Sequence, residues 1–321
     1  MSIIHCQLSI ILAALLDYLI GDPWGWPHPV RAMGYAIARV SDFILRQRWN
    51  PQQQRFAGVI LGVGIIGGSG LVAWLAILAA KAIHPIVGVG VSAIALASCF
   101  AGRSLRDAAF DVLQPLESGD LESARLRLSL YVGRDTEHLS EAEILRAVLE
   151  TVAENAVDGV TAPLFYAIIG MLVPGVGSVP LAIAYKAAST LDSMVGYKKD
   201  PYTHLGWFSA RFEDYLTWWP CRFTVAAIAL LSGKPGRVWQ LCRRDANQDP
   251  SPNSGWSECA YAAALGVQLG GRNVYGGVVK DKPLLGNRDR AISPQVIKDA
   301  LKLTRHCFLL GLAIGSLLIL N

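Results

Sequence analysis

Long apolar runs separated by polar loops constrain this chain more than any other sequence feature. A helix that crosses a bilayer needs about 20 mostly apolar residues, because each residue adds about 1.5 Å. The composition, 52% hydrophobic and only 17% charged residues, lies outside that of a typical soluble enzyme. The pattern predicts an all-α, polytopic helical integral membrane protein. Its expected spans are residues 3–20, 57–79, 86–101, 216–232 and 306–320.

Between the expected spans, two segments have a different character. Residues 102–160 are largely polar, and we expect them to form a helical cytoplasmic segment. They precede two apolar pieces, 162–172 and 179–189, each too short to cross a membrane alone. Irregular backbone in a membrane is tolerated only against protein or a polar cavity, so residues 162–189 are expected to form short re-entrant or broken helices that line a site. No internal repeat is visible, and residues 1–321 are treated as one membrane-embedded catalytic domain.

Charge and cysteine patterns indicate where the protein works. The net charge of +4 is small and the arginines form no basic stripe, which argues against a nucleic-acid partner. Six cysteines without a CxxC pair encode neither a structural zinc site nor a disulfide framework. No basic region precedes the first apolar run, so we expect a retained span in a multi-pass protein of the cell inner (cytoplasmic) membrane. By the positive-inside rule, the loop before the second span is expected to be cytoplasmic, since it holds Arg39, Arg46, Arg48 and Arg55.

A stripe of carboxylates marks the polar segment. Ser140 and Glu143 have capping-box spacing, which predicts a helix that runs to about Val157. At about 100 degrees per residue, Glu143, Glu150, Glu154 and Asp158 fall within an arc of about 80 degrees. Like charges four residues apart destabilise a helix, so this stripe suggests a bound divalent ion or a basic ligand. A solvated helix face explains the same pattern, and the sequence leaves both readings open.

Two further segments are candidates for binding. The loop at 21–34 contains His28 between two prolines, with Arg31 close behind, and such a rigid polar loop is either a binding edge or a simple turn. Lys186 and Asp192 follow the broken apolar pair directly. Ionisable residues next to apolar runs are functional candidates, with a surface position as the alternative.

Several familiar chemistries are poorly supported. The GVGIIG segment (62–67) matches a dinucleotide fingerprint but lies inside an apolar run, where small residues instead let helices approach closely. The chain has no Walker loop, no GxSxG elbow and no HExxH. Clustered Asp, Glu, Arg and Lys are the groups that hold magnesium and phosphate oxygens. Two classes remain open on this reasoning, which are a phosphate-handling membrane enzyme and a cation transporter with carboxylates along its pathway.

Five collinear blocks of the chain have a recognisable pattern, and they are GDPWGWPHPVRAMG (21–34), GRSLRDAA (102–109), residues 133–166, AYKAASTLDSMVGYKKDPY (184–202) and SPNSGWSECAYAAALGVQLGGRNVYGG (251–277). Together they resemble the adenosylcobinamide-phosphate synthase family of cobalamin biosynthesis, the CbiB/CobD proteins. The ETVAEN and TLDSMVGYK motifs are the most specific parts, and the similarity covers residues 16 to about 286. Ser189 and the TWWPCR segment (217–222) depart from the usual family pattern.

The resemblance implies a polytopic inner-membrane ligase. Such an enzyme joins adenosylcobyric acid to (R)-1-amino-2-propanol O-2-phosphate, or to aminopropanol, with ATP and Mg2+. The implied partners are the corrinoid, the amino alcohol phosphate, membrane lipid and other membrane enzymes of late cobalamin assembly. A transporter of a cation or corrinoid precursor is the alternative, and a non-catalytic scaffold is a third reading.

The same resemblance assigns roles to residues of this chain. Glu150, Glu154 and Asp158 are expected to bind the metal and, with Asp192 and Lys186, to form the catalytic set. Asp192 would be a further ligand or the base for the ammonium, and Lys186 would neutralise phosphate oxygens. The expected substrate-binding residues are His28, Arg31, Arg103, Arg134, Asp135, Asn155, Asn253 and Glu258.

Overall fold

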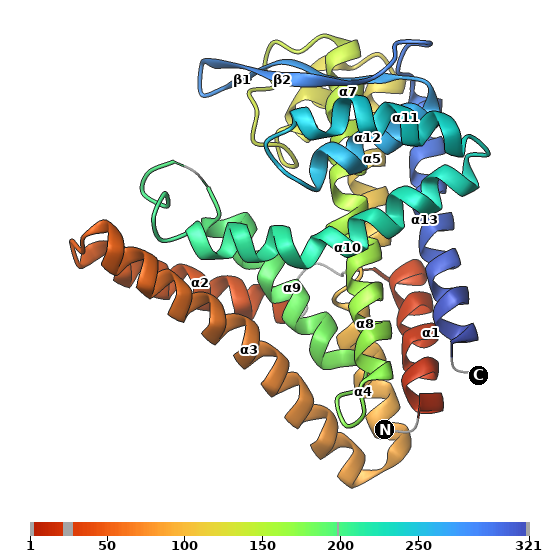
Figure 1. Ribbon diagram of the computed structural model, residues 1–321. Helices are drawn as coiled ribbons and strands as arrows, with labels where there is room; N and C mark the ends of the chain where they lie inside the picture. Colours follow the sequence, from red (N-terminus) through yellow and green to blue (C-terminus); the bar gives the residue numbers. More distant parts are fainter. Residues whose placement is uncertain (1–2, 22–27, 198, 319–321) are drawn as a thin grey trace. The chain divides into compact units, whose positions relative to one another are not determined.

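Helices dominate the computed structural model of the chain, which describes residues 3–21, 28–197 and 199–318 (Figure 1). The predicted helical fold class is confirmed. The α-helices are α1 (Ile3–Leu19), α2 (Pro29–Arg46), α3 (Pro51–Ile83), α4 (Pro85–Ala97), α5 (Gly102–Glu117), α6 (Leu121–Leu128), α7 (Glu141–Ala156), α8 (Ala162–Leu172), α9 (Ser178–Val195), α10 (Trp207–Leu231), α11 (Pro235–Asp245), α12 (Ser254–Leu265) and α13 (Pro294–Leu317). Two short turns, the π-helical η1 (Val157–Thr161) and the 3-10 η2 (Ala246–Gln248), and a hairpin of β1 (Gln268–Tyr275) and β2 (Val278–Gly286) complete the fold.

The chain packs into two compact units. Unit 1 comprises residues 1–101, 162–217 and 311–321, and unit 2 comprises residues 102–161 and 218–310. Each unit therefore combines segments that are far apart in the sequence. The chain leaves one unit and enters the other without a linker, which explains why composition gave no sign of the division.

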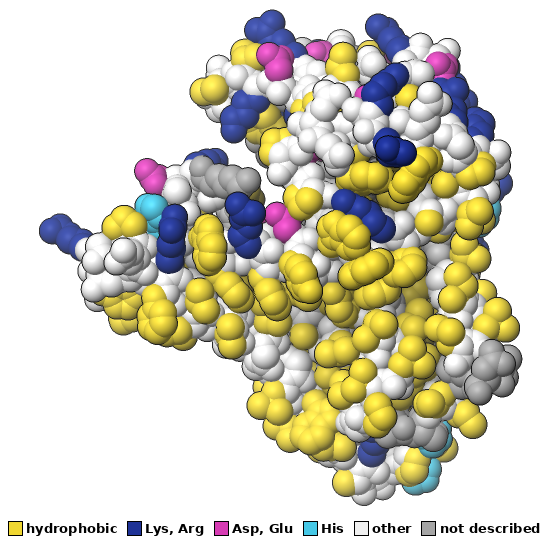
Figure 2. Space-filling model, in the orientation of Figure 1, with side chains coloured by type: hydrophobic (Ala, Val, Ile, Leu, Met, Phe, Trp, Pro, Cys, Tyr) yellow, Lys and Arg dark blue, Asp and Glu magenta, His cyan; other side chains and the backbone are white. Residues whose placement is uncertain are grey.

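Four helices of the described residues are long and apolar enough to cross a membrane, as expected of a multi-pass membrane protein. The expected spans 57–79 and 86–101 fall within two of them, and residues 306–317 of the expected span 306–320 fall within a third. α1 is apolar but has only 17 residues. Hydrophobic side chains gather over α3, the first of the four (Figure 2). The four are 51–83, 85–117, 141–172 and 294–317.

Two expectations about the spans differ from the structure. Residues 162–172 are not an isolated half-length piece, because α7, η1 and α8 form a helix over 141–172. The expected span 216–232 lies in α10, which is not among the four apolar helices of the described chain. α10 is less apolar because it carries Arg211, Glu213, Asp214 and Arg222.

Glycines let α3 pack closely within unit 1. A Cβ atom on Gly58 would lie 3.0 Å from the carbonyl carbon of Leu205, and one on Gly62 would lie 2.5 Å from the ring of Phe208. A Cβ atom on Gly64 would meet nothing within 4 Å. The predicted role of small residues in close approach is therefore confirmed at Gly62 but not at Gly64.

The hairpin in unit 2 was missed by the all-α prediction. Gly276 and Gly277 form its two-residue turn with φ of +56° and +78°, as a type I′ turn requires. A register irregularity between Leu269 and Gly271 leaves Gly270 at φ +85°. A Gly-Gly pair between two strand-like segments is a sequence signal for a β-hairpin. The polar residues on both strands obscured it, because they break the alternation of apolar and polar positions.

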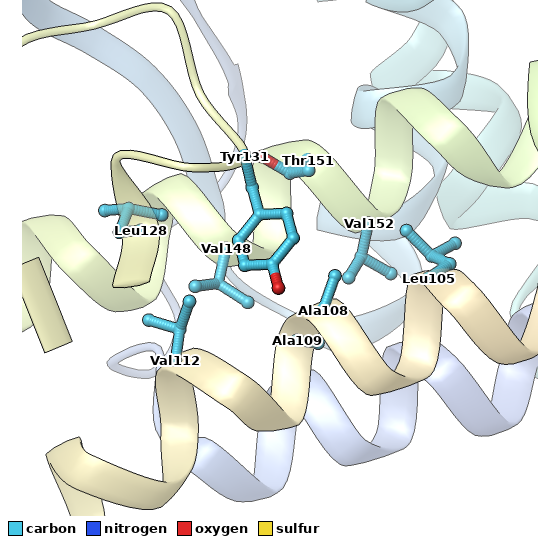
Figure 3. A pocket seen from close by; sticks show the side chains of 9 residues that line it. All are labelled: Leu105, Ala108, Ala109, Val112, Leu128, Tyr131, Val148, Thr151 and Val152. Atoms are coloured by element: carbon cyan, nitrogen blue, oxygen red, sulfur yellow. The ribbon is translucent and has the colours of Figure 1, made fainter. Parts of the chain in front are cut away.

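A small apolar hollow lies where α5 and α7 pack in unit 2 (Figure 3). The Tyr131 ring lies between the two helices, and its hydroxyl donates a hydrogen bond to Asp111 Oδ2 at 3.0 Å. None of the predicted site residues lines this hollow. It is lined by Leu105, Ala108, Ala109, Val112, Leu128, Tyr131, Val148, Thr151 and Val152.

The contact of α3 with the Leu205 backbone predicts an asymmetric response to added methyl groups. Gly58→Ala forces backbone to move and should cost about 1–3 kcal/mol of unfolding free energy. Gly64→Ala adds a methyl group in open space and is the matched control. Thermal unfolding in detergent should give a lower apparent Tm for Gly58→Ala only. Equal Tm values for the two variants would contradict the close approach.

Candidate functional site

α7 begins as predicted but does not present a uniform carboxylate face. The Ser140 amide donates to Glu143 Oε2 at 2.8 Å, which confirms the capping box. The helix ends at Ala156, one residue before the predicted end, and continues as η1. Along the predicted stripe Glu150 is buried, Glu154 is exposed and Asp158 is half-buried. These three carboxylates therefore have different environments.

Glu150 is the centre of a buried ionic network that joins α7 to the hairpin. Its Oε2 accepts from Arg134 at 2.5 Å, and its Oε1 accepts from the Gly270 amide at 2.9 Å. Arg146 lies 3.6 Å from the same Oε1 and also donates to the Gly270 carbonyl. Asn273 Oδ1 accepts from Arg134 at 2.9 Å and from Arg146 at 3.2 Å. Both oxygens of Glu150 are thus occupied by the protein itself.

Asp135 holds the turn of the hairpin. Its Oδ1 accepts from the Gly276 amide at 2.9 Å, its Oδ2 accepts from the Gly277 amide at 2.8 Å, and its own amide donates to Val274 at 2.8 Å. The hydrogen bonds from Gly277 and Gly276 lower the pKa of the Asp135 carboxyl. Asp135 and Arg134, both predicted to bind substrate, contact the hairpin, and their role in substrate binding stays a prediction.

Glu258 on α12 is a fully buried carboxylate with one paired oxygen. Lys282 on β2 donates to its Oε1 at 3.2 Å, whereas its Oε2 has no hydrogen-bond partner among the described residues. Burial raises the pKa of Glu258 to about 8, and Glu154 and Glu150 add to this effect against the attraction of Lys282. Burial opposes the charge on Lys282, yet the attraction of Glu258, Glu154 and Glu150 leaves the pKa of Lys282 raised.

The other predicted residues of unit 2 lie at separate places in that unit. Asn253, buried just before α12, accepts from Arg222 at Oδ1. Arg103 pairs with Asp107 at 3.1 Å near the start of α5. The exposed Asn155 donates to the Thr151 carbonyl one turn earlier on α7.

The predicted residues of unit 1 lie on two helices. His28 is the N-cap of α2, where its Nδ1 accepts from the Val30 amide, and Arg31 is exposed in the next turn. Residues 22–27 of this predicted loop lie outside the described residues. Lys186 and Asp192 are half-buried on α9. Burial and the neighbouring Asp214 raise the pKa of Asp192 to about 6.

The residues fit a magnesium ion only if substrate supplies part of its coordination. No group of three or more His, Cys, Asp or Glu side chains in the described chain is placed to hold a metal. The expected trio of Glu150, Glu154 and Asp158 is therefore not gathered into one cage, because Glu150 is held by two arginines. Protein-bound Mg2+ commonly uses one or two carboxylates together with water and substrate phosphates. The exposed Glu154 and half-buried Asp158 suit that arrangement.

Comparison with known proteins identifies the family. A family model described as CobD/Cbib protein matches residues 10–304. The chain is 56% identical to the cobalamin biosynthesis protein CobD of Synechocystis sp., over 96% of this chain and 90% of that protein. The chain belongs to the CobD/CbiB family of cobalamin biosynthesis proteins.

Two further members of the CobD/CbiB family match along most of their length. The cobalamin biosynthesis protein CbiB of Salmonella typhimurium is 42% identical over 96% of this chain and 95% of its own. The CobD of Geobacter metallireducens is 46% identical over 87% of this chain and 86% of its own. No solved structure matches the chain. The resemblance drawn from the sequence blocks is confirmed at the level of the family.

In this CobD/CbiB protein, the predicted site residues did not include Arg146, Asn273 and Lys282, although Arg134, a cationic partner of Glu150, was among them. Arg146 lies four residues before Glu150, a spacing that predicts an ion pair on a helix. Lys282 and Asn273 could not be placed without the hairpin. The structure therefore adds three residues, Arg146, Asn273 and Lys282, to the predicted cluster.

Removal of Glu150 should destabilise the protein strongly. Glu150→Ala leaves Arg134 and Arg146, whose side chains are only 8% and 14% exposed, without their carboxylate. Breaking such a buried pair costs about 3–5 kcal/mol. The apparent Tm in detergent should fall well below that of Glu141→Ala, an exposed control on the same helix. A Tm equal to that of the control would show that the network is not stabilising.

Glu258 should make stability fall as pH rises. Its folded-state pKa of about 8 lies above the ordinary value of 4.5, so its contribution is fully present below about pH 4.5 and is lost as pH rises through about 8. Glu258→Gln cannot titrate, so it should flatten this loss and have the higher apparent Tm at about pH 8.5. Asp281→Asn, at an exposed position of β2, is the control. Parallel Tm profiles for Glu258→Gln and wild type from about pH 5 to 8.5 would contradict this.

Proposed function

We propose that this protein forms an amide bond between adenosylcobyric acid and (R)-1-amino-2-propanol O-2-phosphate, or aminopropanol, at the expense of ATP. The product is adenosylcobinamide phosphate, or adenosylcobinamide from the free amino alcohol. The observation that carries the proposal is membership of the CobD/CbiB cobalamin biosynthesis family over nearly the whole chain. The exposed Glu154 of α7 and the half-buried Asp158 of η1 give that membership a chemical counterpart.

The chemistry requires activation of a carboxylate. A free propionate does not acylate an amine, because its oxygen is a poor leaving group. In the proposed sequence a propionate oxygen attacks the γ-phosphorus of ATP, ADP leaves, and an acyl phosphate forms. The amine then attacks the acyl carbon, inorganic phosphate leaves, and the amine nitrogen gives up one proton. Positioning and charge neutralisation supply most of the catalysis in phosphoryl transfer.

Individual residues of the chain suit separate parts of this sequence. Glu154 and Asp158 would hold Mg2+, which, when bound, neutralises charge on the transferred phosphoryl group. Asp192, with a pKa raised to about 6, is a stronger base than an ordinary aspartate and would take the proton of the incoming ammonium. Lys186, which lies in unit 1, would pair with phosphate oxygens. Glu150, Arg134 and Asp135 instead organise the scaffold of unit 2.

The site of action proposed is the cell inner membrane. Four apolar helices of membrane-spanning length support a multi-pass protein. A late cobalamin precursor is a large, hydrophilic molecule, so other membrane enzymes of late cobalamin assembly are proposed as partners that pass it on. Membrane lipid would contact the exposed hydrophobic faces of helices such as α3.

Amide formation by the purified protein is the decisive test. Wild-type protein in detergent, given ATP, Mg2+, adenosylcobyric acid and the amino alcohol phosphate, should yield a corrinoid with the mass of the amide. Glu154→Ala should reduce kcat at least about 100-fold, because a ligand to the phosphoryl-transfer metal is lost. Glu141→Ala is the control on the same helix.

Two outcomes would contradict the proposal. Substrate-dependent ion or corrinoid flux in proteoliposomes without any amide would indicate a transporter. Full amide formation by Glu154→Ala would show that this carboxylate of α7 takes no part in the reaction.

A non-catalytic scaffold is tested by the same variant. Unchanged expression and Tm of Glu154→Ala, together with lost activity, would argue against a scaffold.

A further inference from the structure

Arg222 on α10 lies against two indole rings and one side-chain amide. Its guanidinium carbon lies 4.9 Å from the ring centre of Trp218 and 4.7 Å from that of Trp256. Its Nη1 donates to Asn253 Oδ1 at 3.1 Å. All four residues belong to unit 2. The two indole rings and the amide restrict the guanidinium to one position, which reduces the entropy that a ligand would otherwise have to remove.

This arginine has no carboxylate counter-ion in the part of the chain that the structure describes. Ion pairs within 4.0 Å neutralise Arg134, Arg146, Arg237 and Arg244, but none is found for Arg222. Asn253 and the indole rings are neutral groups, so they orient the positive charge without cancelling it. A guanidinium has five N–H donors in a planar fork, and Asn253 takes one of them. The remaining fork suits an oxyanion.

The N-terminus of α12 adds a second positive feature beside Arg222. Asn253 immediately precedes this helix, and its side chain makes no capping bond because its Oδ1 accepts from Arg222. The first turn of α12 contains no acidic residue. A helix of this length places partial positive charge and amide donors at its start, which favours phosphate groups. Arg222 and the helix terminus therefore attract the same kind of ligand.

A proposed metal ligand lies close to the same place. Asp158 interacts electrostatically with Cys221, and the Cys221 thiol donates to the Asn253 carbonyl at 3.3 Å. Cys221 is also the chain neighbour of Arg222. Phosphate oxygens at Arg222 would thus lie near the carboxylate proposed to hold Mg2+.

We propose that Arg222, Asn253 and the start of α12 form a binding site for a phosphate monoester, and that its ligand is the phosphate of the amino alcohol substrate. The assignment rests on the proposed function. It gives the chain a means to prefer the phosphorylated amino alcohol over free aminopropanol, because only the former carries the anion that the guanidinium requires. A nucleotide phosphate has the same chemistry and is distinguished by the experiment.

Binding without turnover tests the site directly. Full-length protein in lipid nanodiscs is titrated with (R)-1-amino-2-propanol O-2-phosphate by calorimetry, with neither ATP nor corrinoid present. Arg222→Gln should weaken binding at least about tenfold, through loss of the charged fork. Asn253→Asp should weaken it similarly, because the near-isosteric carboxylate neutralises Arg222 and repels phosphate. Arg243→Gln, an exposed arginine of α11, removes the same charge and should bind as the wild type does.

Kinetics then separate the two phosphate sources. With all substrates present, Arg222→Gln should raise KM for the amino alcohol phosphate about tenfold or more while KM for ATP stays unchanged. A rise in KM for ATP alone would overturn the assignment, as would wild-type affinity of Arg222→Gln or Asn253→Asp in the titration. If wild type forms no amide at all, the proposed function fails, but the titration still decides whether Arg222 binds the phosphate monoester.

Discussion

The ionic network around Glu150 is the interaction on which unit 2 depends. A buried carboxylate is unfavourable unless donors satisfy it, and here two arginines and one backbone amide do so. Because these donors come from the loop before α7, from α7 itself and from β1, the pairing fixes three segments together. Asn273 binds both arginines and so ties β1 to the same point.

This network divides the carboxylates of α7 and α12 by function. Glu150 is saturated by protein donors and serves the fold. Glu258 is buried with one oxygen unpartnered, and its proton affinity is raised by burial and by the other two glutamates. Glu154 alone of the three is exposed. The proposed Mg2+ ligands are therefore Glu154 and Asp158, without the third carboxylate predicted on the same helical edge. Two carboxylates agree with the small number of protein ligands that Mg2+ needs.

Three arginines of unit 2 differ in their partners. Arg134 and Arg146 have carboxylate partners and contribute to the scaffold, whereas Arg222 is oriented by neutral groups that leave its charge uncancelled. The distinction matters for the proposed ligase activity, because its substrates are anionic. A phosphate receptor near Asp158 would bring the substrate anion and the metal ligand to one side of unit 2. The sequence analysis named Arg134 as a substrate-binding residue and gave Arg222 no role.

The sequence by itself determined the helical membrane fold, the start of α7 and the family. Apolar run length, capping-box spacing and collinear motifs are local properties, so each could be read without knowledge of contacts. Helical periodicity also placed Glu150, Glu154 and Asp158 along one edge, but it could not say which element covers that edge. Tertiary structure decided this, because the hairpin that buries Glu150 comes from about 120 residues further along the chain. For the same reason the partners of Glu258 and Arg222 became visible only when α10, α12 and the hairpin were packed together.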